Sequence, residues 1–118
     1  LTDVDVAEQA KVDGAVVDQL IAAGLVTPDA AGHFTADDVH IASTAAALAE
    51  FGFDERHLKT LRTTASRQAD LIARVTQPVA KSRQVSAEQK AEEIGQQLTA
   101  LVVSLHASLV KNELNNWR

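Results

Sequence analysis

The sequence predicts a mainly α-helical protein of one domain, and three observations support this class. The chain has 118 residues, enough for one hydrophobic core and too few for two. Its apolar residues are mostly Leu, Val, Ile and Ala, with three Phe and one Trp, and Ala and Leu favour helices. Five stretches carry apolar residues at helical spacing beside helix-capping residues.

Two short helices are expected first, at residues 3–10 and 14–23. Thr2 with Asp5 three residues later is the pattern of a capping box, in which each side chain bonds the other's backbone N–H. Asp13 is a favourable first cap for the second helix. The first half of the chain therefore begins with two helices joined by a tight connection.

Residues 25–34 predict a loop. Gly24 precedes it, at a position where a left-handed residue commonly ends a helix. Pro28-Asp29 within it is typical of a turn. We expect Leu25-Val26 and His33-Phe34 to pair across this turn as a small ribbon.

A third helix is expected at residues 36–51. Thr35 and Asp38 repeat the capping-box spacing before it, and Gly52 ends it. One face of this helix is apolar and small, with the side chains Val39, Ala42, Ala46 and Ala49.

Two long helices complete the chain. Asp54 caps the first, and Pro78 ends it near Thr76 because proline disfavours helix before and after it. Ser86 and Gln89 form a further capping box, from which the last helix runs to about Leu114.

Residues 78–85 join these two helices, and such a short connection favours an antiparallel helical hairpin. The apolar stripes are wider than one partner helix needs, so we expect a homodimer through the hairpin. The alternative is a monomer in which the first three helices cover the surplus. Hairpin or dimer packing is assigned to Leu61, Ile72, Val75, Leu98, Leu101, Leu105 and Leu109.

The charge is unevenly distributed. The chain has 16 acidic and 11 basic residues, a net charge of −5, and such a balance argues against nucleic acid as its main ligand. Residues 1–54 hold ten acids and one base, whereas residues 55–118 hold six acids and ten bases. This asymmetry indicates two surfaces with different roles, or two halves that attract each other; solvated helix faces are the simpler interpretation.

The order of elements in residues 1–53 is that of a winged helix-turn-helix, with three helices and a small wing. Gly24-Leu25-Val26-Thr27-Pro28, followed by Gly32-His33-Phe34 and Asp38-Val39, resembles the wing of the MerR family of bacterial transcription regulators. Gly52-Phe53 resembles the glycine and aromatic residue that follow the next helix in that family. The resemblance covers about residues 2–75.

The DNA-reading residues of that family are replaced. MerR-type DNA readers carry an Arg and two aromatic residues where this chain has Asp18-Gln19-Leu20, and residues 25–34 contain no Lys or Arg. Carboxylates oppose the counterion release that drives phosphate binding. The resemblance therefore implies a degenerate winged helix that does not itself bind DNA.

The whole chain resembles the C-terminal effector and dimerisation domain of an actinobacterial MerR-family regulator of cell-division genes (FtsR type). Residues 45–58, Ala69-Asp70-Leu71-Ile72 and Leu105-His106 carry this resemblance. It implies a cytoplasmic homodimer in which DNA and RNA polymerase are bound only through the full-length protein. We therefore interpret residues 1–118 as one regulatory domain, with a winged-helix-like half at 1–53 and a hairpin at 54–118.

The absence of Met and the start at Leu1 favour a fragment of a longer protein that lacks its N-terminal DNA-binding domain. The main alternative is an autonomous winged-helix DNA-binding domain that uses the helix at 14–23.

An effector site is expected where the two halves meet. Phe51, Phe53 and Leu58 would form its floor, and Arg56 and Arg62 its rim, which suits an acidic small molecule, peptide or protein segment. The alternative is that the basic row of Arg56, Lys59 and Arg62 is a solvated helix face or pairs with the acidic half of the chain.

Other chemistry has little support in the sequence. Cysteine is absent, which excludes disulfides and thiolate catalysis, and no Ser-based or glycine-rich catalytic motif is present. Asp37 and His40 have a spacing that suits a metal, but a capped, solvated helix start is the favoured interpretation. We expect no enzymatic activity, no cofactor, no metal and no membrane-spanning segment.

Overall fold

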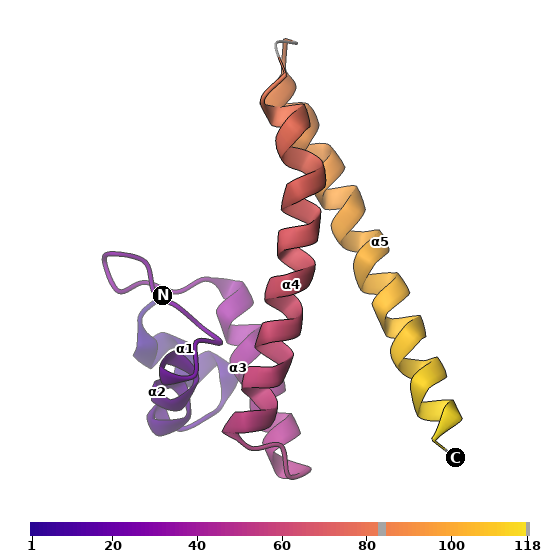
Figure 1. Cartoon of the computed structure of the whole chain (residues 1–118). Coiled ribbons are helices and arrows are strands. Elements are labelled where there is room, and N and C mark those ends of the chain that lie inside the picture. Colours follow the sequence, from indigo (N-terminus) through magenta and orange to yellow (C-terminus); the bar gives the residue numbers. More distant parts are fainter. Residues whose placement is uncertain (83–84, 118) are drawn as a thin grey trace. The chain divides into compact units, whose positions relative to one another are not determined.

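The computed structural model describes residues 1–82 and 85–117, which form five α-helices and no strand (Figure 1). The chain divides into two compact units, Leu1–Thr64 and Ala65–Arg118. The helices are α1 (Asp3–Ala10), α2 (Gly14–Ala22), α3 (Ala36–Glu50), α4 (Glu55–Ala80) and α5 (Ala87–Asn116). The prediction of a mainly helical protein is confirmed, and α4 supplies residues to both units.

The first unit holds the main hydrophobic core. Helix α1 packs against both α2 and α3. The valines Val6, Val17 and Val26 are the largest fully buried side chains, and Leu58 from the start of α4 closes the same core with 9% of its surface exposed. Leu58 lies in α4, so the start of this helix belongs to the core of the first unit, Leu1–Thr64. The remaining buried members are Ala10, Leu20, Phe34, Ala42 and Ala45.

Two predicted capping boxes are confirmed. The backbone N–H of Asp5 donates to Thr2 Oγ1 at 3.2 Å, and that of Thr2 donates to Asp5 Oδ2 at 2.9 Å. The same exchange joins Thr35 and Asp38 before α3. Asp13 occupies the cap position of α2, but its side chain makes no capping hydrogen bond.

The helices of the first unit end in left-handed turns. At Gly24 (φ 79°), the N–H of Leu25 donates to Leu20 O at 2.9 Å, and that of Gly24 itself to Ile21 O at 3.0 Å. These two bonds define a Schellman motif. Gly52 (φ 94°) ends α3 in the same way, and Lys11 (φ 59°) ends α1 in the same way without a glycine.

The expected ribbon in residues 25–34 is wrong. The N–H of Phe34 donates to the carbonyl of Leu1 at 2.6 Å and does not pair with Val26. The side chain of Val26 is buried in the core. Asp29 organises the loop, because its carboxylate accepts the N–H groups of Ala31 and His33, each at 2.9 Å. Such local bonds to an Asp side chain stabilise a turn without any strand.

Helix α4 continues through Pro78 to Ala80, so the predicted end near Thr76 is wrong. Pro78 lacks the N–H that would bond to the carbonyl four residues earlier, but it lies in the last turn, so few residues of the helix follow it. The N–H of Lys81 still donates to Gln77 O at 3.0 Å. Residues 83 and 84 of the predicted connection lie outside the described part of the chain.

The capping box predicted at Ser86 is also wrong. Ser86 adopts a left-handed backbone (φ 65°) and makes no side-chain capping bond. The extended backbone that normally aims a serine hydroxyl at the third N–H of a helix is therefore missing.

In the second unit, the partly covered side chains recur mainly at four-residue steps. On α5 the covered positions include Leu98, Val102 and His106, and on α4 they include Gln68, Ile72 and Thr76. Leu101, Leu105, Leu109 and Val75 are more than half exposed in the single chain. Their expected packing is therefore not seen in the single chain. Trp117, the one tryptophan, follows α5 and is also exposed.

Within residues 1–82 and 85–117, every helix is too short or too polar to cross a lipid bilayer.

Candidate functional site

A groove of about 380 Å³ opens in the first unit between α2, α3 and the start of α4. We call it the α2–α3 groove. Ala45, Ala46 and Ala49 of α3 form one wall, and α2 forms the opposite wall. Phe53, which is 37% exposed, and Leu58 close one end. Its other lining residues are Val16, Gln19, Leu20, Ala23, Asp54 and Glu55.

The groove exists because α3 is rich in alanine. Alanine is the strongest helix former, so a run of alanines makes a stable helix whose side chains do not fill the space beside it. A second hollow of about 210 Å³ is lined by Leu58, Ala45, Ile41 and Leu61, among others, so it shares Ala45 and Leu58 with the groove. Leu58 at the start of α4 and Ala45 of α3 therefore lie between the groove and this second hollow.

The charge at the groove is negative. The carboxylate of Asp54 accepts the backbone N–H of His57 at 3.0 Å, and this hydrogen bond holds the pKa of Asp54 below its ordinary value. The N–H of Asp54 donates in return to His57 Nδ1 at 3.1 Å. Asp54 is thus fixed and ionised at neutral pH, at the predicted start of α4.

Glu55 is the second carboxylate. It pairs with Lys59 Nζ at 3.2 Å, and both side chains are more than half exposed. Exposed ion pairs contribute little because water screens them. No Lys or Arg is among the residues that line the groove.

Arg62 binds the backbone of the turn that ends α2. Its Nε donates to the carbonyl oxygen of Gly24 at 2.9 Å. This bond joins α4 to the turn that ends α2, where helix carbonyls lack partners and a positive charge is favourable. Arg62 is not among the residues that line the α2–α3 groove.

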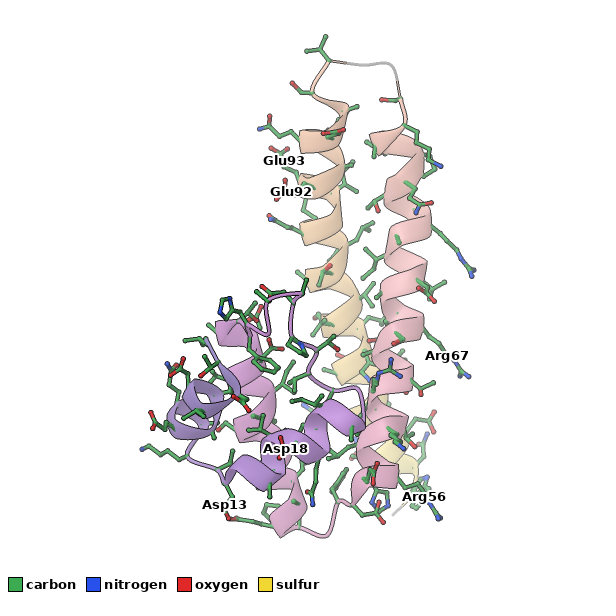
Figure 2. The ribbon with its side chains drawn as sticks, turned by 90° about the vertical axis from the view of Figure 1, so that its left-hand side faces the viewer. Asp13, Asp18, Arg56, Arg67, Glu92 and Glu93 are labelled. Atoms are coloured by element: carbon green, nitrogen blue, oxygen red, sulfur yellow. The ribbon has the colours of Figure 1, made fainter. Side chains whose placement is uncertain are left out.

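The structure brings together two of the five predicted effector residues. Phe53 and Leu58 lie in the groove, whereas Phe51 is 84% exposed. Arg56 lines an adjoining shallow surface with Lys59 and Thr63, and this surface shares Asp54 and Glu55 with the groove. Figure 2 shows Arg56 extending away from the helix that carries Asp13 and Asp18. The rim is therefore acidic instead of basic.

Sequence reasoning missed the polar and small lining residues, namely Gln19, Ala45, Ala46, Ala49, Asp54 and Glu55. The alanine spacing in α3 was the available signal, since small residues at positions i and i+4 leave a depression along one helix face.

The second unit presents apolar and charged surface. A hollow of about 470 Å³ is lined by Ile72, Ala69 and Thr76 from α4 and by Thr99, Val102 and Val103 from α5, together with Ala65, Gln68 and Ala73. Figure 2 shows Glu92 and Glu93 pointing to one side of this unit and Arg67 to the other. These opposite charges are therefore not directed at each other within the chain.

In the part of the chain that the structure describes, no three His, Asp or Glu side chains lie together in a way that would hold a metal ion. Asp37 and His40 both belong to α3.

Comparison with known proteins gives a consistent result. The family described as "Rv1828-like, C-terminal domain" matches residues 1–118. Two similar relatives are the "Uncharacterized HTH-type transcriptional regulator Rv1828" of Mycobacterium tuberculosis and "Uncharacterized HTH-type transcriptional regulator Mb1859" of Mycobacterium bovis. Each is 35% identical over 112 residues, which is 95% of this chain and 45% of the relative. The chain thus spans less than half the length of these relatives.

Proposed function

Because this chain belongs to the Rv1828-like C-terminal domain family, we propose that it is the regulatory and self-association part of a transcription regulator and does not itself bind DNA. The relatives' names call them HTH-type transcriptional regulators, which supports a role in transcription. The proposal includes no enzymatic activity and places the work of the domain in the cytoplasm, where bacterial transcription occurs.

The acidity of α2 is the observation that carries the non-DNA-binding role. In a winged helix-turn-helix the corresponding helix enters the major groove of DNA, and Lys and Arg side chains beside it contact the phosphates. Helix α2 has the sequence GAVVDQLIA, with Asp18 and no Lys or Arg. The loop after it carries Asp29 and no Lys or Arg. Each carboxylate on that face would oppose phosphate binding.

In this proposal the first unit is a degenerate winged helix whose wing, residues 25–34, has lost its strands. The finer assignment is to the MerR family, of the FtsR type that regulates cell-division genes. DNA and RNA polymerase would then be contacted by the full-length protein through a separate DNA-binding domain. The resemblance of residues 24–39 to a MerR wing supports this assignment.

The second unit is proposed to be an antiparallel helical hairpin that forms a homodimer. The contact of about 3.7 Å expected between a Cβ at Gly95 and the methyl group of Thr76 supports packing of α5 on α4. Leu101, Leu105 and Leu109 leave an apolar surface open on α5, and large exposed apolar surfaces commonly mark interfaces. The outward-pointing Glu92, Glu93 and Arg67 offer opposite charges that two copies would bring together (Figure 2).

The α2–α3 groove is the proposed effector site. It combines a partly open, mainly apolar volume with a small number of polar groups, as ligand sites commonly do. Phe53 and Leu58 are retained from the sequence prediction.

The test combines sizing with DNA binding on the same sample. Light scattering of the purified chain is expected to give the mass of a dimer. Titration with labelled duplex DNA at about 50 mM salt is expected to give no shift at micromolar protein, because electrostatic binding would be strong at this salt.

A double variant provides the matched comparison. Asp18→Arg with Asp29→Lys restores positive charge to the same face and is expected to increase nonspecific binding. A monomeric mass would contradict the dimer. A salt-sensitive shift by the unaltered chain would contradict the non-DNA-binding role and favour an autonomous DNA-binding domain that uses α2.

A further inference from the structure

We propose that the α2–α3 groove binds a small organic cation, with an apolar body against the α3 alanines and a protonated amine at Asp54 and Glu55. This inference deepens the proposed function, since it names the chemical class of the effector. It replaces the acidic ligand that the sequence suggested.

The size and composition of the groove favour a small molecule. Its volume of about 380 Å³ lies at the lower end of the range of about 300–1,000 Å³ that holds small ligands. Eight of its eleven lining residues are apolar: Val16, Leu20, Ala23, Ala45, Ala46, Ala49, Phe53 and Leu58. The alanine side chains are small, so an aromatic ring or a short alkyl chain is the apolar body that we expect against them.

The charged side chains that line the groove are all negative. The charged groups are Asp54 and Glu55, and the third polar residue is the neutral Gln19. Anion recognition relies on Lys, Arg or a cluster of N–H donors, and no Lys or Arg lines this groove. A cation is therefore the ligand charge that the lining complements.

Asp54 is prepared for this role by its position. Its hydrogen bond from the N–H of His57 fixes the carboxylate at the start of α4 and keeps it ionised. Phe53 lines the same groove as Asp54, and its ring centroid lies 5.4 Å from that of His57, the residue whose N–H binds Asp54. A carboxylate next to an aromatic ring is a favourable setting for an ammonium group.

The first measurement uses three probes with the same apolar body and different end charge: 4-phenylbutylamine, 4-phenylbutanol and 4-phenylbutanoate. NMR titration of the full chain is expected to show saturable binding of the amine, with amide shifts at Ala45, Ala46 and Ala49. The alcohol is expected to bind about tenfold more weakly, because it loses a charge-assisted hydrogen bond. The acid is expected to bind more weakly still.

Two pairs of variants test the two halves of the site. Asp54→Asn with Glu55→Gln keeps a helix cap but removes both charges, so amine affinity should fall to that of the alcohol. Glu50→Gln, which removes a carboxylate that does not line the groove, is its control. Ala49→Phe should fill the groove and abolish binding of all three probes, whereas Ala47→Phe on the same helix should leave binding unchanged.

Equal affinity for the three probes, or amide shifts confined to other residues, would overturn the proposal. So would failure of all three to bind. If this occurs while the chain is dimeric and ignores DNA, the cation site fails and the proposed function stands. If the amine binds as expected but the chain binds DNA, the proposed function fails and the cation site stands.

Discussion

Gly24 and Arg62 are far apart in sequence and depend on each other in the fold. Gly24 ends α2 with a positive φ, and its carbonyl accepts the Nε of Arg62 at 2.9 Å. A Cβ built at Gly24 would lie 2.9 Å from that same Nε. The glycine is therefore needed for its backbone conformation and for the close approach of the guanidinium.

Gly24→Ala is expected to destabilise the first unit by about 1–2 kcal/mol, because a left-handed backbone is unfavourable for L-residues with a side chain. Displacement of Arg62 adds to this cost. Urea unfolding measures the effect. Gly14→Ala is the control, since nothing lies within 4 Å of a Cβ there and its φ is not positive. Equal stability of the two variants would contradict the role assigned to the Gly24–Arg62 bond.

Three aspartates link stability to acid pH. Hydrogen bonds from the backbone N–H groups of Thr2, His33 and His57 are the main cause that lowers the pKa values of Asp5, Asp29 and Asp54 below the ordinary 3.8. A pKa lowered in the folded state stabilises the fold above the unfolded pKa, and this contribution is lost as pH falls toward the folded pKa. The loss therefore occurs below about pH 4.

Asp54→Asn is expected to flatten the acid limb of the stability profile. Asparagine caps a helix as aspartate does but does not titrate. Urea unfolding at a series of pH values between about 7 and 2.5 measures this. Asp13→Asn is the control, because the Asp13 side chain makes no capping bond. An unchanged acid limb in Asp54→Asn would contradict the argument.

Helix boundaries were predictable where local chemistry fixes them. Capping boxes form at Thr2 and Thr35, and glycines end helices at Gly24 and Gly52. The hydrogen bonds of each motif join residues three to five positions apart, so the spacing in the sequence identifies them. Ser86 has the same spacing but a left-handed backbone, which sequence does not reveal. Pro78 was wrongly predicted to end the helix, because spacing does not reveal that α4 accommodates the missing N–H and the proline ring.

Pro78→Ala is expected to stabilise α4 by about 1–3 kcal/mol, since alanine restores an N–H donor and removes the clash of the ring with the carbonyl four residues earlier. Thermal unfolding followed by circular dichroism measures the gain. Gln77→Ala is the neighbouring control and should change stability by less than about 0.5 kcal/mol. A gain no larger than that control would show that α4 already accommodates the proline without strain.

The chain as a single copy leaves much apolar surface uncovered. Leu101 is 66% exposed, and Leu105 and Leu109 are also more than half exposed on the same helix. The apolar periodicity predicted these residues as packed, and it does not distinguish contacts within a chain from contacts between chains. The groove was harder to predict, because its lining comes from α2, α3 and α4 and its charge depends on which face of α4 is turned inward.

If the chain forms the proposed dimer, Leu101→Asp is expected to weaken it by about 100-fold or more, because burial of an unpaired carboxylate at an interface costs about 3 kcal/mol or more. Sedimentation over a range of concentrations measures this, and thermal stability should lose its dependence on concentration. Gln97→Asp adds the same charge to α5 and is the control. A dimer of unchanged affinity in Leu101→Asp would place the interface elsewhere.

The position of Trp117 gives the molecule a built-in optical signal. It is the one tryptophan, there is no tyrosine, and it stands 86% exposed after the last turn of α5. Its indole emission consequently reports the polarity around one helix end and nothing else in the chain. Any event that covers that end, from subunit pairing to capture of another macromolecule, will be visible in fluorescence without an added dye.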